Sequence, residues 1–225
     1  MNIFKMLCRT LVLSAVAVAL SVGVTGCPGN TGDNPVKPDN NSSNTFTDSR
    51  DGKTYRTVKI GNQTWMAENL NYVTDSSWCS GGTPDGCAKY GRGYTWYAAA
   101  GVCPRGWHLP DRDEWDRLAR SVGGTEDGSR GMREWHNAGI ELKSTSGWDR
   151  NGNGTNSSGF SAMPGGNRST DGEFTHVGDN GNWWTAVESN DGDAYFRFMD
   201  DDKDKLGEWP YPTGWGFSVR CVKDE

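Results

Sequence analysis

The 225-residue chain lacks the motifs that mark most catalytic sites. It has no HExxH metal motif, no G-x-S-x-G nucleophile turn and no glycine-rich phosphate loop. Its three histidines, His108, His136 and His176, stand alone in the sequence, which favours structural or surface roles. Asp111 and Glu114 fit a helix cap better than the carboxylate pair of a glycoside hydrolase. We therefore expect a protein that is not an enzyme and needs no cofactor.

The chain also lacks an excess of basic residues and a long apolar run. It carries 23 Lys and Arg against 29 Asp and Glu, a formal net charge of -6. Without a basic stripe it has no general attraction for nucleic acid, so we expect no nucleic-acid partner. The apolar residues 11–24 are too few for a membrane-spanning helix, which needs about 20.

The N-terminus has the layout of a secretory signal. Lys5 and Arg9 precede the apolar stretch, and small residues lead to Cys27. The phrase Val-Thr-Gly-Cys resembles a bacterial lipobox. That resemblance implies cleavage before Cys27 and acylation of this residue, with palmitate among the acyl groups, and two or three acyl chains would anchor the protein on a membrane. The alternative is an ordinary signal peptide with an incidental cysteine.

The segment after Cys27 has the composition of a disordered tether. Val36 is its one aliphatic residue up to residue 44, so it cannot bury enough apolar surface to offset its chain entropy. By resemblance to the enterobacterial sorting rule, Pro28 favours the outer membrane. We therefore predict a signal peptide at 1–26, a tether at 27–47 and one domain at 48–225, lipid-anchored in the cell envelope.

Four cysteines remain for the folded part, and an even number in an exported domain indicates disulfides. Three pairings of Cys79, Cys87, Cys103 and Cys221 are possible. The turn-forming phrase Ser-Gly-Gly-Thr-Pro-Asp-Gly between Cys79 and Cys87 favours a local bond, which leaves Cys103 with Cys221. A zinc site is the competing interpretation, but the spacing does not fit one.

Local patterns predict the secondary structure. Residues 53–66 read as a hairpin that turns at Gly61-Asn62. Asp111 and Glu114 form a capping box for a helix that buries Trp115, Leu118, Ala119 and Val122 on one face. Further elements are expected as short helices within 94–103 and 132–143, and as strands at 183–187, 194–199 and 216–222.

Several separated phrases resemble one known family in the same order. They include Ile60-Gly-Asn-Gln-Thr-Trp-Met-Ala-Glu-Asn-Leu-Asn-Tyr72, Val102-Cys-Pro-Arg-Gly-Trp-His-Leu-Pro110, Gly159-Phe-Ser-Ala-Met-Pro-Gly-Gly166 and Gly216-Phe-Ser-Val-Arg-Cys221. These resemble the Fibrobacter succinogenes major paralogous domain of bacterial surface lipoproteins, over about residues 48–224. The resemblance brings no settled molecular activity with it.

A more distant resemblance implies a fold. Residues 95–118 and 216–221 resemble the two-helix opening and the last strand of C-type lectin-like domains. That likeness implies an α+β domain with two helices against a small twisted antiparallel sheet and long loops on one side. It also implies a Cys103–Cys221 bond. The formylglycine-generating enzymes share a similar phrase, but they work with reactive cysteines, and every mature cysteine here already has a lipid or disulfide role.

Calcium is the one ion for which the sequence offers a partial pattern. Residues 149–154 are similar to the first half of a calcium loop, but Phe160 stands where a bidentate glutamate belongs. The acids of Asp200–Asp204 could hold an ion only weakly. We therefore expect no metal site, with weak calcium binding as the alternative.

Two function classes remain. The first is a non-catalytic recognition module for glycan or protein, which would use long loops on a braced scaffold. Its candidate ligand-binding residues are Trp183, Trp184, Arg197, Trp209, Tyr211 and Trp215. The alternative is a structural or adhesive envelope protein without a defined small ligand. The segment from Trp209 to Trp215 is the strongest candidate site, although a buried plug would use the same residues.

Overall fold

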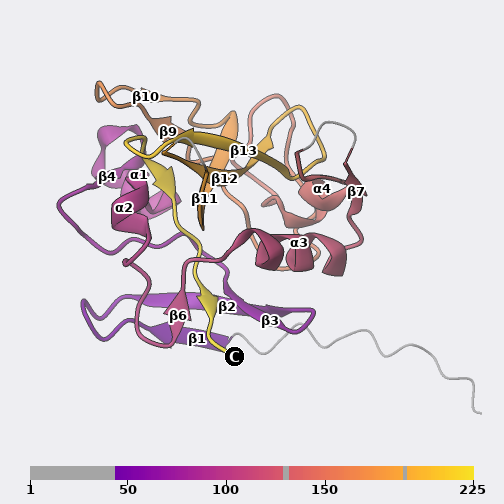
Figure 1. Cartoon of the computed structure of the whole chain (residues 1–225), viewed down its shortest axis with the longest axis horizontal. Helices are drawn as coiled ribbons and strands as arrows, with labels where there is room; N and C mark the ends of the chain where they lie inside the picture. Colours follow the sequence, from indigo (N-terminus) through magenta and orange to yellow (C-terminus); the bar gives the residue numbers. More distant parts are fainter. Residues whose placement is uncertain (1–43, 129–131, 190–191) are drawn as a thin grey trace, which may run out of the picture. The chain divides into compact units, whose positions relative to one another are not determined.

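The computed structural model describes residues 44–128, 132–189 and 192–225. These residues form fifteen strands in four sheets, with four short α-helices beside them (Figure 1). The predicted α+β, C-type lectin-like fold is therefore wrong, because strands dominate and no pair of helices covers one small sheet. The glycine-rich region from 123 to 216, expected to carry the long loops, contributes seven of the fifteen strands. The predicted signal peptide and Cys27 lie outside the described residues.

The first sheet has five strands in the order β1-β2-β3-β15-β6. They are β1 (Asn44–Thr47), β2 (Thr54–Ile60), β3 (Gln63–Met66), β15 (Val222–Lys223) and β6 (Trp107–His108). Ile60 pairs with Gln63 across a turn in which Gly61 has a φ of 58°, which confirms the predicted hairpin. Residues 44–47, assigned from the sequence to the tether, instead form β1 and pair with β2.

The second sheet has six strands in the order β13-β12-β11-β14-β5-β4. They are β13 (Gly207–Pro212), β12 (Asp193–Asp200), β11 (Asn180–Glu188), β14 (Phe217–Ser218), β5 (Arg92–Tyr94) and β4 (Ser77–Cys79). Two ribbons complete the strands: β9 (Asn167–Arg168) with β10 (Phe174–Thr175), and β7 (Thr125–Asp127) with β8 (Glu134–His136).

The C-terminal segment joins the two sheets. Its first strand, β14, belongs to the second sheet, and its last strand, β15, belongs to the first. Cys221 lies between them, fully buried, and bonds to Cys103. The second disulfide joins Cys79 to Cys87. Both bonds are those that the sequence predicted.

The helices are α1 (Pro84–Tyr90), α2 (Trp96–Ala99), α3 (Arg112–Ser121) and α4 (Ala138–Leu142), with a 3-10 turn, η1, at Ser80–Gly82. The predicted capping box of α3 is present, since Asp111 accepts from the Glu114 amide over 2.7 Å and the Glu114 carboxylate accepts from the Asp111 amide. The helices expected within 94–103 and 132–143 are shorter than predicted. Strand pairing takes Tyr94 into β5 and residues 134–136 into β8. Within the described residues, none of the helices has the length and apolar character to cross a membrane.

The core consists of two hydrophobic clusters. In the first, the rings of Trp65 and Trp115 lie 5.0 Å apart, and Phe160 packs edge-on against both. In the second, Trp184 packs on Phe217 with ring centroids 4.4 Å apart. The many tryptophans therefore supply large buried areas in a chain with few aliphatic residues.

Candidate functional site

The β12–β13 hairpin builds an aromatic surface. Side chains directly opposite one another in an antiparallel pair lie on the same face, and Phe196 of β12 is opposite Trp209 of β13. Phe198 is opposite Gly207, where a Cβ would lie only 2.3 Å from the Phe198 ring. Glycine at 207 therefore lets this ring lie over the neighbouring strand. As the alternating sequence predicts, Phe196 and Phe198 share one face, and Arg197 points to the other.

An open groove of about 430 Å³ lies on this surface. Its apolar lining consists of six aromatic side chains: Phe196, Phe198, Trp209, Tyr211, Trp215 and Phe217. The ring of Tyr211 stands edge-on to that of Trp215, with centroids 4.8 Å apart. Trp209 is 51% exposed, so it can offer a ring face to a ligand. The structure thus brings Trp209, Tyr211 and Trp215 together, as the sequence suggested.

The polar lining of the groove holds three amides, a hydroxyl and an imidazole, and two of the amides are held in place. It consists of Asn167, Thr175, His176, Asn180 and Asn182, from β9, β10 and β11 and the chain beside β10. The Asn182 amide donates to the Gly166 carbonyl over 3.2 Å, and the Asn180 amide donates to Asp200 over 2.5 Å. Among the described residues no Lys, Arg, Asp or Glu lines the groove. Fixed amides and stacked rings suit the binding of a neutral ligand.

Trp183, Trp184 and Arg197 are not part of this groove. All three side chains are fully buried. Trp183 donates from Nε1 to Asn69 Oδ1 over 2.8 Å, and Trp184 donates to the Tyr94 carbonyl over 2.7 Å. Their prediction as ligand-binding residues is corrected accordingly: strand β11 is central in the second sheet, so its tryptophans pack inside.

Arg197 belongs to a buried ionic cluster. Its Nη2 lies 2.7 Å from Asp116 Oδ1 and 3.0 Å from Glu208 Oε2. Burial lowers the pKa of Arg197, while both carboxylates oppose that shift. Arg112 also pairs with Glu208, and Arg133 also pairs with Asp116. The cluster therefore joins α3 to the side of the second sheet away from the groove.

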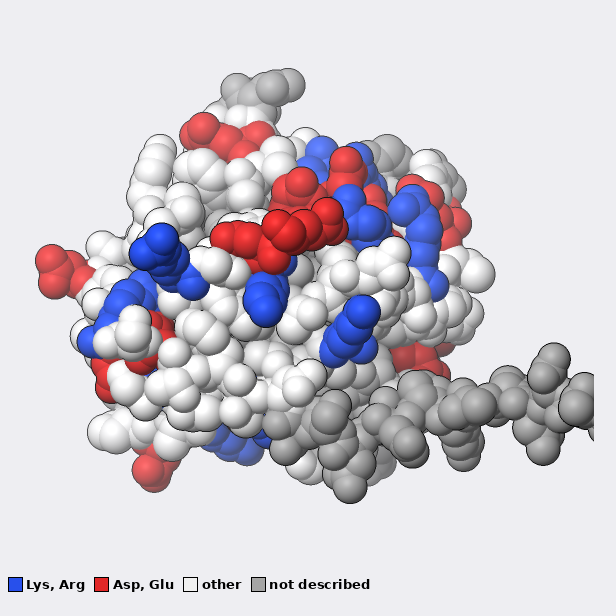
Figure 2. All heavy atoms as spheres, turned by 90° about the horizontal axis from the view of Figure 1, so that it is seen from below, with Lys and Arg blue, Asp and Glu red and all other residues white. Residues whose placement is uncertain are grey.

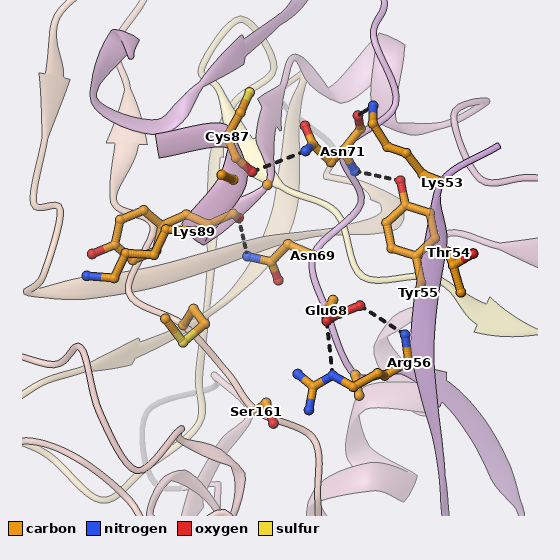
Figure 3. Close-up of a pocket in the computed structure, with 15 residues that line it drawn as sticks. Lys53, Thr54, Tyr55, Arg56, Glu68, Asn69, Asn71, Cys87, Lys89 and Ser161 are labelled. Carbon is orange, nitrogen blue, oxygen red and sulfur yellow. Dashed lines mark hydrogen bonds and ion pairs between the residues drawn. The ribbon is translucent and has the colours of Figure 1, made fainter. Parts of the chain in front are cut away.

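A second hollow, of about 410 Å³, lies between β2 and α1 (Figure 3). Its polar side chains bond mainly to one another and to the backbone. Arg56 Nε pairs with Glu68 at 3.0 Å, and Lys53 Nζ donates to the Asn71 carbonyl over 2.5 Å. Asn69 donates to the Tyr90 carbonyl over 2.9 Å. These contacts brace the junction of the two sheets, and we assign no ligand to this hollow.

Lysine and arginine side chains contact the acidic turn at Asp200–Asp204, the segment considered above as a weak calcium site. Lys143 is 3% exposed, and its Nζ donates to the carbonyls of Asp200 and Lys203 over 2.9 and 2.7 Å. Arg150 Nε donates to Asp201 over 2.7 Å. The ammonium and guanidinium groups thus contact the oxygens that an ion would need. Lys143 carries no signal of this role in the sequence.

One further cluster holds possible metal ligands. Ligand atoms of Asp127, Glu134 and His136 lie within 4.8 Å of one another on the β7–β8 ribbon. Lys205 Nζ already lies 2.7 Å from Glu134. Such exposed acidic groups occur without an ion, and we assign none here.

One face of the domain carries charged side chains of both signs. On the face shown in Figure 2, acidic side chains form a short band, and basic side chains lie around it rather than in a continuous stripe. The groove is distinguished by its aromatic lining, which includes no Lys, Arg, Asp or Glu among the described residues.

The sequence indicates only three of the eleven residues that line the groove. Phe196 and Phe198 were expected on one strand face but not as ligand contacts, and Phe217 was read only as part of the last strand. The asparagines carried no signal, because Asn167 and Asn182 meet only through the contact between β9 and β11.

The described residues define a disulfide-braced, β-rich domain with an open aromatic groove. The chain belongs to the Fibrobacter succinogenes major domain family, whose family model matches residues 58–223. No curated protein and no solved structure matches the chain.

Proposed function

We propose that this protein is a lipid-anchored bacterial envelope protein whose aromatic groove binds a neutral glycan without catalysing a reaction. The observation that carries the proposal is the groove lining: six aromatic rings, amides, a hydroxyl and the His176 imidazole, with no Lys, Arg, Asp or Glu among the described residues. Membership of the Fibrobacter succinogenes major domain family supports an envelope protein of bacteria.

A sugar ring matches this lining in chemistry and size. It has an apolar C–H face that can stack on an aromatic ring, and a rim of hydroxyls that pair with amides. Ligand sites commonly combine a mostly apolar wall with a few fixed polar groups, in volumes of about 300–1,000 Å³. The volume of about 430 Å³ falls in that range. Trp209, 51% exposed, is the ring that we expect to stack on the sugar.

The position of the groove fits display from an anchor. The described chain begins at Asn44 in β1, the edge strand of the first sheet. The groove lies on the second sheet and the β9–β10 ribbon, and Figure 1 shows β1 far from β9, β10 and β13. A chain anchored at Cys27 would thus reach the domain at the first sheet, which does not form the groove.

Binding of the full chain, purified in detergent, to an array of neutral oligosaccharides tests the proposal. We expect a hit with micromolar to millimolar affinity that Trp209→Ala weakens at least tenfold. Tyr97→Ala is the matched control, because Tyr97 is 69% exposed but does not line the groove. If both variants weaken binding equally, the groove is not the site.

The alternative class, a structural or adhesive envelope protein without a small ligand, predicts a different result. No glycan on the array would bind, and Trp209→Ala would change nothing in this assay. A protein ligand in place of a glycan would give the same negative array, and either outcome would overturn the glycan proposal.

A further inference from the structure

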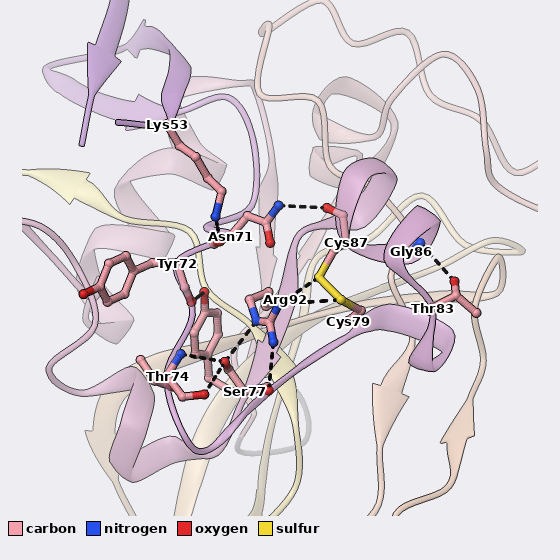
Figure 4. Close-up of a disulfide and its surroundings, with 11 residues drawn as sticks. Lys53, Asn71, Tyr72, Thr74, Ser77, Cys79, Thr83, Gly86, Cys87 and Arg92 are labelled. Carbon is pink, nitrogen blue, oxygen red and sulfur yellow. Dashed lines mark hydrogen bonds between the residues drawn. A yellow bond between two sulfur atoms is a disulfide. The ribbon is translucent and has the colours of Figure 1, made fainter. Parts of the chain in front are cut away.

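The local disulfide lies directly against a guanidinium group (Figure 4). Arg92 Nη1 is 3.1 Å from Cys87 Sγ and 3.6 Å from Cys79 Sγ. Both cysteines are half-buried, so a small solute can approach the bond. Arg92 follows α1 and lies opposite Cys79 in the β4–β5 pairing. The strand pairing therefore fixes the position of the Arg92 backbone beside the disulfide.

The rest of the Arg92 side chain is fixed by neutral partners. Its Nε donates to Ser77 Oγ over 3.0 Å, and its Nη2 donates to the Ser77 carbonyl over 3.2 Å. Within the described part of the chain, no carboxylate forms an ion pair with Arg92. Its positive charge is thus directed at the two sulfur atoms.

We propose that Cys79–Cys87 is a thiol-exchange site in which Cys87 is the leaving thiolate. A nearby cation lowers the pKa of a thiol, and a thiol of lower pKa leaves faster in exchange. Because Nη1 is closer to Cys87 than to Cys79, negative charge is stabilised best on the Cys87 sulfur. Exchange therefore begins with attack on Cys79.

The reaction balances with a small thiol as the reductant. The incoming thiolate attacks Cys79 Sγ, the Cys79–Cys87 bond breaks, and its electron pair goes to Cys87 Sγ beside Arg92. This step leaves a mixed disulfide on Cys79. A second thiolate then attacks the small-molecule sulfur and releases Cys79. Two thiols become one disulfide, and the protein bond becomes two thiols.

The long-range disulfide has a different environment. Cys221 is 0% exposed and part of the second hydrophobic cluster, and Cys103, itself half-buried, packs against the same cluster. A thiolate that attacks Cys103 would have to expel the Cys221 thiolate into an apolar, fully buried environment, where burial raises the pKa of a thiol and makes it a poorer leaving group. Exchange should therefore be selective for Cys79–Cys87 while Cys103–Cys221 stays intact.

Timed treatment of the folded full chain with dithiothreitol, followed by alkylation and peptide mapping, measures each bond separately. We expect Cys79–Cys87 to open at least tenfold faster than Cys103–Cys221. Arg92→Met should slow its opening by about threefold to tenfold, and Arg92→Lys should restore much of the rate. Thermal unfolding checks that each variant is folded.

A second measurement needs no variant. Glutathione, which adds as a mixed disulfide, should be found on Cys79 after brief exposure of the wild-type chain. Adducts mainly on Cys87, or equal opening rates for wild type and a folded Arg92→Met chain, would overturn the proposal. If Arg92→Met does not fold, the position of the glutathione adduct alone decides it.

Discussion

Arg197 in β12 and Asp116 in α3 form an ion pair of 2.7 Å inside the protein, with side chains 0% and 6% exposed. Glu208 lies on the same guanidinium at 3.0 Å. Two buried carboxylates thus share one fully buried cation, and each also pairs with a second, partly exposed arginine, Arg133 for Asp116 and Arg112 for Glu208. These ion pairs explain why the Arg197 side chain lies in the buried cluster and not in the groove.

Arg197→Met should lower the free energy of unfolding by about 1.5–3 kcal/mol, because each carboxylate loses a charge-assisted contact but keeps its second arginine. Denaturant unfolding measures this loss. Arg120→Met is the control, because Arg120 and Glu126 are 58% and 47% exposed and 3.7 Å apart, and such pairs contribute about 0–1 kcal/mol. Equal losses in the two variants would contradict the cluster's structural role.

Alanine substitutions at Trp209 and Tyr211 should differ in their effect on the free energy of unfolding. Trp209→Ala removes a half-exposed ring and should change the free energy of unfolding by about 0.5 kcal/mol or less. Tyr211→Ala should cost about 2 kcal/mol or more, because its ring contacts Phe196, Trp215 and Phe217. Thermal unfolding of both variants checks this. A large loss with Trp209→Ala would make that ring part of the core and remove it from the proposed site.

Local features were predictable from the sequence, and long-range ones were not. The 53–66 hairpin, the α3 capping box and both disulfides follow from neighbouring residues or from simple elimination. The tryptophans 183 and 184 show the limit: two adjacent aromatic residues look alike whether a strand lies at an edge or in the centre of a sheet. The pairing of β11 with β12 and β14 decided the matter, and nothing local encodes it.

The C-type lectin-like expectation failed for the same reason. It extended a likeness of short phrases at 95–118 and 216–221 to the whole architecture. The intervening chain, rich in Gly and Asn, carries weak local preferences. Its strands form because partners exist elsewhere in the chain, as where Trp183 of β11 pairs with Ser218 of β14.

His108 should make stability depend on pH. Its Nδ1 lies 2.7 Å from Asp224 and its Nε2 lies 3.0 Å from Glu114. Burial lowers the pKa of His108, but these hydrogen bonds outweigh it and hold the pKa above 6.5. Folding therefore favours the protonated form. The stabilisation that protonated His108 contributes to the folded state is complete below pH 6.5, and it is lost as the pH rises through the folded-state pKa of His108.

We therefore expect the free energy of unfolding to fall as the pH is raised from 6 towards 8, and His108→Gln to remove this slope. Because the side chain is 41% exposed, the change should be below about 1 kcal/mol. Urea unfolding across this pH range measures it. His176→Gln is the control, since among the described residues His176 forms an ion pair only with Asp179, at 3.5 Å. A slope unchanged by His108→Gln would rule out this histidine as its source.

The two disulfides should differ in their contribution to stability. They span 118 and 8 residues, for which the chain-entropy model gives about 5 and about 2.5 kcal/mol. The double variant Cys103→Ala with Cys221→Ala should therefore unfold at a lower denaturant concentration than Cys79→Ala with Cys87→Ala. The reverse order would mean that contacts around the local bond, including Arg92, outweigh loop entropy.

Cys27→Ser should release the protein from the membrane. Cys27 follows the lipobox-like phrase, and about 0.8 kcal/mol per buried CH₂ makes two or three acyl chains a firm anchor. The described domain offers no membrane-spanning helix. We expect wild type in the detergent phase after phase separation and Cys27→Ser in the aqueous phase. Cys8→Ser, inside the predicted signal peptide, should partition like wild type. A Cys27→Ser chain that still partitions into detergent would show that the apolar residues 11–24 hold the protein, and the lipid anchor would have to be abandoned.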